Sequence, residues 1–481
     1  MTLIDRLRDD LLTADYTLDG VQRRLGEAAL AALARNSSVA AGRALAGATD
    51  PQADAIRLWL LHESVPGERA ARFDALPQLR AAGLLTDGPT IRATVELKPY
   101  GSERRQGWIC SDITELDGGA ARPRPDFVLG ASPASTTLAQ LIPRKPVGSA
   151  LDLGTGCGIQ SLHLADHCDR IVATDLNPRA LDLARITLGL SGVTADLRRG
   201  SLYEPVASDA FDLIVTNPPY VLSPPGGELV YREGSFSGDG LMRTVVAGSA
   251  RHLAPEGTLV VLGNWAITGE PCQERLASWI PDGCDALVLQ RASLDPYEYI
   301  EVWLADAGLL GTPQYLPAYH RWLDYFDSLG IGGVGLGWIV LRNSGRERPD
   351  VRVEDWPHSV VQPVGDALGA HFDAIDPARL SDEALLSATL VRAASLTQEA
   401  LGEPGAAHPQ HIVLRQGIGL CRAVAVDTMI AAVVGACDGD LPLGVLVEAV
   451  ASLTGVDPVR LAGDVLPGLR PLIADGMLQL G

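Results

Sequence analysis

Short apolar runs alternate with helical patterns between residues 121 and 345. The apolar runs predict seven strands, at 150–153, 170–174, 194–198, 211–216, 258–262, 286–290 and 335–341. Apolar residues at helical spacing predict helices near 158–167, 178–190, 239–253, 270–280 and 296–306. This alternation is typical of an α/β domain built on a parallel, Rossmann-like sheet with helices on both faces. The last strand is glycine-rich and follows a long segment, which favours an antiparallel strand at the sheet edge.

The region before this domain, residues 1–120, predicts helices followed by a hairpin. Apolar residues recur at helical spacing in 21–33, 53–61 and 76–85. Residues 91–97 then alternate like a strand, and 98–101 predict a turn. Helices followed by a short hairpin resemble a winged-helix module.

The region after the domain, residues 346–481, follows a linker at 344–349 and predicts helices near 380–401 and 422–437. Its end, 466–478, echoes the pattern of 76–85, so we interpret it as a second winged-helix-like module. Chance similarity between two amphipathic helices is the alternative. A winged helix usually binds DNA. Because this chain is acidic, a role as a scaffold or in docking a partner protein is favoured at least as much as DNA binding.

Composition and charge narrow the class of protein. The chain has 481 residues, of which 47% are hydrophobic, and its formal net charge is −20. An acidic field opposes binding to phosphate backbones, which counts against a nucleic-acid partner without excluding one. No apolar run approaches the length of a membrane span, and the N-terminus lacks the pattern of a secretory signal, so we expect a cytoplasmic enzyme with no membrane partner. The seven cysteines are scattered without a CxxC pair, which favours free thiols over disulfides or a metal site.

A glycine-rich loop follows the first strand of the predicted sheet. Asp152 is followed by Gly154, Thr155, Gly156 and Gly158. Glycine permits positive φ and lets the backbone approach a ligand closely. The spacing differs from the Gly-x-Gly-x-x-Gly of dinucleotide folds, so no pyrophosphate is indicated, and S-adenosylmethionine (SAM) is favoured over NAD.

A second acid stands at the end of the next strand. Asp175 follows a run of apolar residues and precedes Leu176 and Asn177. A carboxylate at this strand end can accept hydrogen bonds from both hydroxyls of a ribose. The two acids together with the glycine loop therefore predict a site for a nucleoside-bearing cofactor.

The fourth strand ends in the sequence Asn217-Pro218-Pro219-Tyr220. Two consecutive prolines fix φ and remove two backbone donors, so the backbone offers carbonyl oxygens. The side-chain oxygen of Asn217 and the carbonyl of Pro218 can both accept from one NH2 group, while Tyr220 can stack on the flat group that carries it. This pattern predicts a clamp for a planar nitrogen, in which alignment and placed acceptors supply most of the catalysis.

With these motifs, residues 125–345 resemble the class I SAM-dependent methyltransferases, and more narrowly their Asn-Pro-Pro-Tyr amino-methyltransferases. That group includes release-factor glutamine, ribosomal RNA guanine-N2 and adenine-N6 methyltransferases. The resemblance implies that Asn217 to Tyr220 bind the acceptor. It implies a SAM site made of Asp152, Gly154, Thr155, Gly156, Gly158, Asp175, Leu176, Ser201, Leu202 and Asn217. Ser201 departs from the family, which often has an acid there that binds the adenine amino group.

The resemblance also suggests where a substrate is held. Thr136 lies in the family's pre-sheet segment, and Tyr231, Arg232 and Glu233 lie in a loop after the clamp that resembles the substrate cover of the glutamine-modifying members. A plain surface loop is the alternative for these three. We therefore expect an N-methyltransferase acting on a protein or peptide amide. An exocyclic amine of RNA or DNA, a small-molecule amine and a SAM-sensing DNA-binding regulator are the alternatives. The oligomeric state is not predicted.

Overall fold

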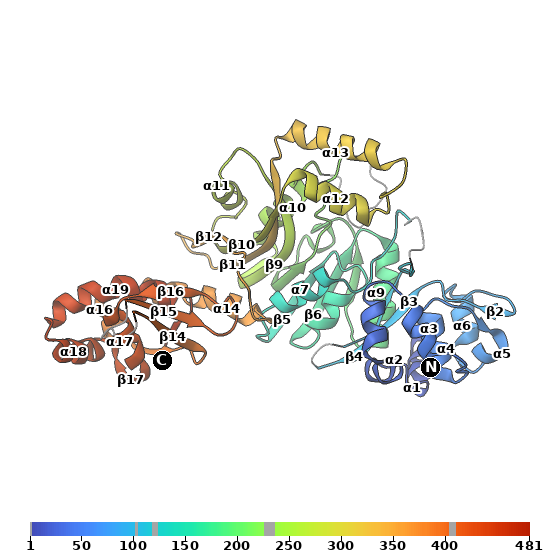
Figure 1. Ribbon diagram of the computed structural model, residues 1–481, viewed down its shortest axis with the longest axis horizontal. Helices are drawn as coiled ribbons and strands as arrows, with labels where there is room; N and C mark the ends of the chain where they lie inside the picture. The colour runs from blue at the N-terminus through green and yellow to red at the C-terminus, as the bar shows by residue number, and fades with distance from the viewer. Residues whose placement is uncertain (1, 102–103, 118–123, 226–235, 404–409) are drawn as a thin grey trace. The chain divides into compact units, whose positions relative to one another are not determined.

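A computed structural model describes residues 2–101, 104–117, 124–225, 236–403 and 410–481. The chain divides into two compact units (Figure 1). The first contains residues 1–139 and 146–355, and the second contains residues 140–145 and 356–481. Within the described residues, no helix is long and apolar enough to cross a membrane.

A mixed sheet of eight strands forms the centre of the first unit, in the order β12-β10-β11-β9-β8-β5-β6-β7. Its strands are β5 (Val147–Leu153), β6 (Cys168–Asp175), β7 (Asp196–Arg199), β8 (Phe211–Thr216), β9 (Leu253–Ile267), β10 (Cys284–Leu294), β11 (Gly333–Asn343) and β12 (Val351–Asp355). Strands β7, β6, β5, β8 and β9 are mutually parallel. The predicted α/β fold with a largely parallel sheet is confirmed.

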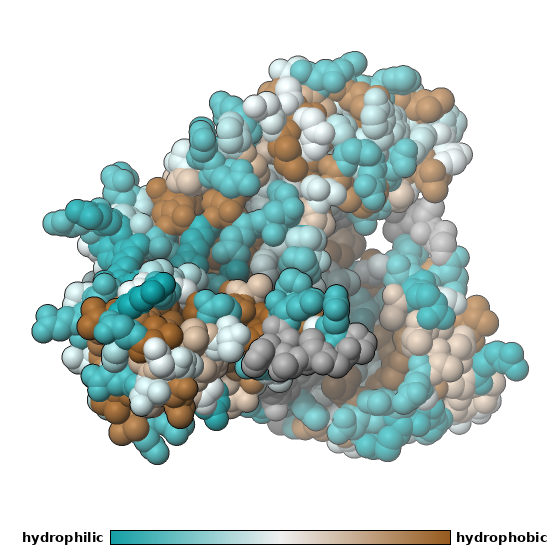
Figure 2. Space-filling view, turned by 60° about the vertical axis from the view of Figure 1, so that its left-hand side comes forward, coloured by the Kyte–Doolittle hydropathy of each residue, from teal (hydrophilic) through white to brown (hydrophobic). Residues whose placement is uncertain are grey.

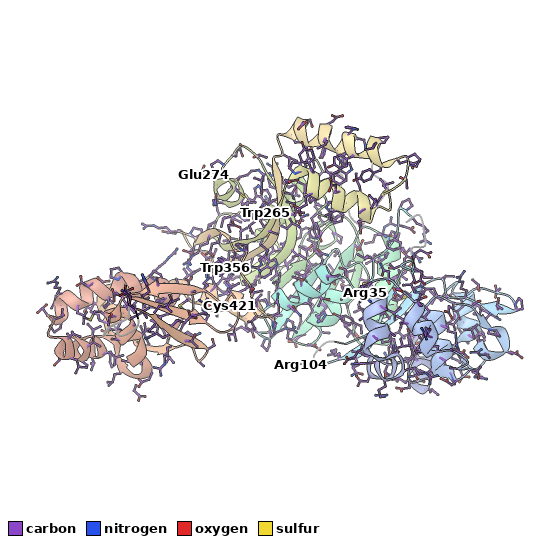
Figure 3. All side chains as sticks on the ribbon, in the orientation of Figure 1. Arg35, Arg104, Trp265, Glu274, Trp356 and Cys421 are labelled. Carbon is purple, nitrogen blue, oxygen red and sulfur yellow. The ribbon has the colours of Figure 1, made fainter. Side chains whose placement is uncertain are left out.

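Two details of the predicted sheet were wrong. The sheet has eight strands instead of seven, because β12 pairs with β10 beyond the predicted end of the domain. The glycine-rich strand β11 is antiparallel, as predicted, but it lies between β9 and β10 instead of at the edge. Its glycines allow β11 to lie between β9 and β10, because a side chain on Gly335 would overlap Trp265, and one on Gly337 would overlap the carbonyl of Leu289. Trp265 is fully buried on β9 (Figure 3).

Helices follow the strands close to their predicted positions. They are α7 (Pro133–Leu141), α8 (Ile159–Leu164), α9 (Pro178–Leu190), η1 (Glu204–Val206), α10 (Gly240–Gly248), η2 (Ser249–Arg251), α11 (Cys272–Ala277), α12 (Pro296–Asp306) and α13 (Tyr315–Leu329). Helices α7 and α13 were not predicted from the sequence, although in α13 the residues Tyr315, Tyr319, Trp322 and Phe326 recur at helical spacing. Helix α13 packs its aromatic residues around Tyr299 of α12.

The N-terminal part of the first unit consists of helices and two short strand pairs. Its elements are α1 (Leu3–Thr13), α2 (Leu18–Leu33), α3 (Val39–Ala44), α4 (Pro51–Trp59), β1 (Val65–Pro66), α5 (Gly67–Ala70), α6 (Leu76–Ala81), β2 (Thr90–Ile91), β3 (Glu96–Gly101) and β4 (Gln106–Ser111). The predicted single strand at 91–97 was wrong, because β2 pairs with β1 while β3 pairs with β4. Residues 98–101, predicted as a turn, belong to β3.

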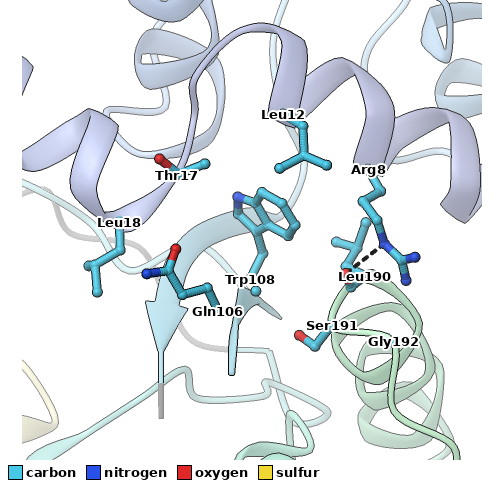
Figure 4. A pocket seen from close by; sticks show the side chains of 10 residues that line it. Arg8, Leu12, Thr17, Leu18, Gln106, Trp108, Leu190, Ser191 and Gly192 are labelled. Atoms are coloured by element: carbon cyan, nitrogen blue, oxygen red, sulfur yellow. Dashed lines mark hydrogen bonds between the residues drawn. The ribbon is translucent and has the colours of Figure 1, made fainter. Parts of the chain in front are cut away.

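This N-terminal part shares one hydrophobic core with the sheet domain. Buried residues of its helices and hairpin pack in the same cluster as Cys157, Ile159, Ala180 and Leu183. At the far end of α9, the guanidinium of Arg8 donates to the carbonyl of Leu190 at 2.8 Å, beside a cavity of about 240 Å³ (Figure 4). Arg8 thus satisfies carbonyls that a helix end leaves without partners.

The second unit combines helices with two three-stranded sheets, in the orders β17-β13-β18 and β14-β15-β16. Its helices are α14 (Gly365–Asp373), α15 (Ile375–Ala378), α16 (Asp382–Ser387), α17 (Thr428–Ala436), α18 (Leu443–Thr454) and α19 (Pro458–Ala474). Its strands are β13 (Thr389–Arg392), β14 (Leu396–Leu401), β15 (His411–Gln416), β16 (Ala423–Val426), β17 (Asp438–Pro442) and β18 (Leu478–Leu480).

The predicted helices at 380–401 and 422–437 were wrong over much of their length. The first ends at Ser387, and strands β13 and β14 follow it. The second begins as strand β16 and becomes helical only at Thr428. The secondary structure of these segments depends on strand partners far along the chain. Leu390, for example, is fully buried opposite Leu480.

The visible surface is mixed in hydropathy. Hydrophilic residues are spread over the face in Figure 2, with hydrophobic ones between them. Such a surface is usual for a folded chain, because scattered apolar side chains alone mark no site.

Candidate active site

The glycine loop begins where β5 ends and leads into α8. Gly154, Gly156 and Gly158 have φ values of 75°, 55° and 86°, which favour glycine. A Cβ on Gly154 or Gly156 would meet nothing within 4 Å, so the loop backbone faces open space there. A Cβ on Gly158 would lie 3.3 Å from Ala184 of α9. The first two glycines therefore leave room for a ligand, and the third permits close helix packing.

Asp152 holds this loop from the inside. Its carboxylate is 1% exposed and accepts hydrogen bonds from the Thr155 hydroxyl at 2.6 Å and from the Ser161 amide and hydroxyl at 2.9 and 2.7 Å. Burial raises the pKa of this carboxyl, although the three donors act in the opposite direction. Through these bonds Asp152 fixes the turn that presents the glycine backbone.

Asp175 stands beside the loop at the end of β6. Its carboxylate accepts from the amides of Gly156 at 2.9 Å and Asn177 at 2.8 Å, and burial raises its pKa. The next residue, Leu176, is 56% exposed despite its apolar side chain. Leu202, after the end of β7, has a φ of 47°. A carboxylate next to an exposed apolar side chain can receive a ribose and an adenine.

Ser201 also lies at the end of β7. Its amide donates to the carboxylate of Glu204 at 3.3 Å, and the residue is half-buried.

The clamp lies next to the glycine loop. Leu153 and Thr216, the last residues of β5 and β8, are register partners, and the Thr216 hydroxyl donates to the Leu153 carbonyl at 2.7 Å. Gly154 and Asn217 follow directly, so the structure brings the two predicted motifs together. Asn217 Oδ1 is buried and has no hydrogen-bond partner among the described residues. A buried acceptor without a partner is costly, and it suits a group that binds an NH2 donor.

A small cavity adjoins the clamp. Pro219 and Tyr220 line it together with Leu241, Met242 and Asn264. Burial raises the pKa of the Tyr220 hydroxyl, so this side chain stays neutral and can offer an apolar ring face at ordinary pH.

The sequence analysis missed residues that brace the clamp from α12 and β9. The Tyr299 hydroxyl is fully buried and accepts from the amide of Leu222 at 3.0 Å and from the side-chain amide of Asn264 at 3.3 Å. On α13, the Tyr325 hydroxyl accepts from the amide of Gly238 at 2.7 Å. The aromatic spacing of α13 was the available signal, but nothing local linked these tyrosines to the clamp.

We expect Tyr299→Phe to lower both stability and turnover. The variant leaves the buried amide of Leu222 without an acceptor, which costs about 1–3 kcal/mol of unfolding free energy. It also loosens the chain just after the clamp, so kcat should fall more than the affinity for SAM. Denaturant unfolding and isothermal titration would measure both. Tyr203→Phe is the matched control, since the Tyr203 hydroxyl donates to Val245 elsewhere; equal losses of kcat in the two variants would contradict the bracing role.

The N-terminal hairpin contacts α8, the helix that follows the glycine loop. The Tyr100 hydroxyl lies 2.7 Å from His163 Nε2 of α8 and also hydrogen-bonds Thr136 of α7. Glu96, on the same strand, is hydrogen-bonded to Ser111, and burial raises the pKa of its carboxyl to about 7. Tyr100 thus links Thr136 of α7 to His163 of α8. The sequence analysis missed Tyr100 and Glu96, because no motif marks either of them.

The raised pKa of Glu96 makes stability depend on pH. Because the folded protein holds this proton up to about pH 7, whereas the unfolded chain releases it near 4.5, ionisation removes stability as pH rises through that window. We expect Glu96→Gln to abolish this loss, so the Tm of the variant should exceed that of the wild type at pH 8 and the two should converge near pH 4.5. Calorimetry at several pH values would measure the difference, and a constant difference across the range would contradict it.

Tyr231, Arg232 and Glu233, the remaining predicted substrate contacts, lie outside the described residues.

Comparison with known proteins agrees with this geometry. A family model described as a methyltransferase small domain matches residues 130–278. The release factor glutamine methyltransferase of Xylella fastidiosa is 32% identical over 229 residues, which are 44% of this chain and 76% of that protein. The chain belongs to the SAM-dependent methyltransferases of this small-domain family. It transfers the methyl group of SAM to a nitrogen, and the resemblance seen in the sequence is confirmed.

Other relatives of the methyltransferase are matched over shorter lengths. The ribosomal protein uL3 glutamine methyltransferase of Bradyrhizobium diazoefficiens is 32% identical over 24% of this chain and 40% of its own length. The ribosomal RNA small subunit methyltransferase C of an Enterobacter species is 29% identical over 24% of this chain and 31% of its own length. A model described only as a domain of unknown function matches residues 13–96.

Proposed function

We propose that this methyltransferase transfers the methyl group of SAM to the side-chain amide nitrogen of a glutamine in a protein. The observation that carries the proposal is the buried Oδ1 of Asn217, which has no hydrogen-bond partner in the described part of the chain and lies one residue past the point where β8 pairs with the end of β5. A primary amide offers the flat NH2 group that such an acceptor needs. The relatives named as glutamine methyltransferases support the same class of acceptor.

The proposed chemistry uses the chain's own groups for alignment. Asn217 Oδ1 and the Pro218 carbonyl each accept one N–H of the amide, and Tyr220 stacks on its plane. These two bonds aim the nitrogen lone pair and favour a tetrahedral nitrogen as the N–CH3 bond forms and the S–CH3 bond breaks. The nitrogen then releases its surplus N–H proton to water, and S-adenosylhomocysteine is the second product. SAM supplies an electrophilic methyl group, so no strong base is required, and placed acceptors supply the catalysis.

The residues of the first unit fit SAM. The open backbone at Gly154 and Gly156 leaves room for the methionine portion, next to Thr155 and the Asn217 clamp. We propose that Asp175 accepts from the ribose hydroxyls. We further propose that Leu176 and Leu202 hold the adenine on its faces while Ser201 lies at its edge. Asp152 and Gly158 maintain the loop.

An exocyclic amine of RNA is the second candidate. The relatives that act on ribosomal RNA favour it, whereas the net charge of −20 opposes it. Because the chain belongs to an enzyme family, the alternative of a SAM-sensing DNA-binding regulator is disfavoured.

We propose that the parts at 1–120 and 346–481 serve as a scaffold or in partner docking, around a catalytic domain at 121–345.

Labelled SAM would test the proposal. The protein is incubated with it and with cell fractions treated with protease or with nuclease. We expect the label to be sensitive to protease, and hydrolysis of the labelled protein to amino acids to release a methylated glutamine. Label that is sensitive to nuclease would instead identify RNA as the substrate. Asn217→Ala protein serves as the blank, because it should bind SAM without transferring the methyl group.

A further inference from the structure

Two helices next to the clamp carry an unusual surface. Helices α12 and α13 lie at the top of Figure 1 and pack against each other around Tyr299. Residues 295–329 hold six acidic side chains and one arginine, a net charge of −5 in 35 residues, whereas the whole chain of 481 residues carries −20. All six are exposed: Asp295, Glu298, Glu301, Asp306, Asp324 and Asp327. This density of charge exceeds that of the chain as a whole about threefold.

Large apolar side chains are exposed on the same two helices and on the turn between them. Tyr297, Val302, Leu310 and Leu316 are 59%, 50%, 67% and 64% exposed. Single exposed apolar residues need no explanation, but four within 20 residues, interleaved with carboxylates, resemble the mixed surface of a docking site. We call this exposed face of α12 and α13, with its turn, the acidic platform.

The acidic platform is joined to the clamp. The fully buried Tyr299, on the inner side of α12, accepts from the amide two residues after Tyr220, and Tyr325 of α13 accepts from Gly238. The charge of Asp306 acts on the Tyr220 hydroxyl. Val221 and Leu222 belong to the same hydrophobic cluster as the inner faces of the two helices. The helices that carry the platform on their exposed face therefore pack, with their inner faces, on the segment that follows the clamp.

The matched small-domain model ends at residue 278, before both helices. The platform is thus outside the part of the chain that this family model describes. An element beyond the common catalytic domain, but packed on its clamp, is well placed to choose the substrate.

We propose that the acidic platform docks a lysine- and arginine-rich segment of the protein substrate, with apolar residues of that segment covering Tyr297, Val302, Leu310 and Leu316. Charge complementarity selects this occupant: a basic protein segment is attracted, while the phosphates of an RNA are repelled. This inference rests on the proposed function, since it names the substrate class of the same site.

Paired charge reversals in the full-length protein test the platform. Glu298→Lys with Asp324→Lys alters two exposed carboxylates that make no side-chain hydrogen bond or ion pair among the described residues, and Glu256→Lys on β9 with Glu274→Lys on α11 makes the same change in net charge elsewhere on the sheet domain. The substrate is the protein that takes up label from SAM. We expect the platform variant to raise KM about tenfold at low salt with kcat and SAM affinity unchanged, and the control to stay within about twofold. Equal KM values in the two variants would overturn the proposal.

A binding measurement separates this inference from the proposed function. A fluorescent peptide of alternating lysine and leucine is titrated onto the wild-type protein, and a glutamate–leucine peptide serves as the comparison. Preferential binding of the lysine peptide, lost in the platform variant, is expected. Equal binding of the two peptides would overturn the platform, whereas failure of any protein to accept label would overturn the proposed function and leave the peptide result readable.

Discussion

Asn217→Ala is expected to lower kcat by about 100- to 1000-fold while the affinity for SAM stays within a few fold. The variant removes an acceptor that acts on the reacting nitrogen itself, and loss of one placed hydrogen-bonding group at a reacting centre has effects of this size. Because Asn217 Oδ1 is buried and no described residue bonds to it, its removal should not lower the unfolding free energy. Single-turnover kinetics, isothermal titration and thermal unfolding would give the three quantities.

Two further variants sharpen this experiment. Asn217→Asp retains an acceptor oxygen and should keep more activity than the alanine variant. Asn343→Ala removes an asparagine whose amide donates to Leu253 at 3.0 Å, far along the sheet from the clamp, and should reduce stability without affecting kcat. If Asn217→Ala lost stability and SAM affinity in proportion to kcat, Asn217 would be a structural residue and the proposed clamp would fail.

Asp152→Ala is expected to abolish measurable SAM binding and to cost about 2–4 kcal/mol of unfolding free energy. The substitution leaves the Thr155 hydroxyl and the amide and hydroxyl of Ser161 without their common acceptor in a buried place. The glycine loop would then lose its fixed turn, and with it the backbone geometry proposed for the cofactor. Isothermal titration and denaturant unfolding would measure the two effects.

Asp212→Ala is the matched control for the loop. The Asp212 carboxylate accepts from the amide and hydroxyl of Ser149, at 2.8 and 3.0 Å, so it joins β8 to β5 four residues before the loop begins. This variant should also lose stability, yet it should still bind SAM. Comparable loss of SAM binding in both variants would show that general destabilisation, and not the loop, accounts for the Asp152 result.

The sequence predicted the sheet domain well because its signals are local. Strands β5, β6 and β8 contain short apolar runs, and the residues that form the cofactor loop and the clamp follow their strands directly. Since carboxyl ends of parallel strands meet at one edge, the two motifs had to come together, and the pairing of Leu153 with Thr216 shows that they do.

The parts that sequence analysis missed depend on contacts between distant residues. Leu390 and Val391 were predicted as helix, but their partners Leu480 and Gln479 lie about ninety residues further along the chain. The placement of β11 between β9 and β10 likewise depends on Trp265 filling the space above its glycines. Tyr299 and Tyr100 reach the site from elements without a motif, so only the packed structure reveals their roles.

The shared core of the N-terminal helices and the sheet domain limits how this enzyme can be dissected or recombined. A protein begun at residue 130, where the small-domain match starts, would expose Cys157, Ile159 and Leu183 to water and would lack the Tyr100 contact with α8. Such a truncation should aggregate instead of yielding a minimal catalyst. The first hundred residues are therefore an integral part of the folded enzyme and not a separable domain. Grafting them onto another methyltransferase would require that protein to carry the matching surface of α8 and α9.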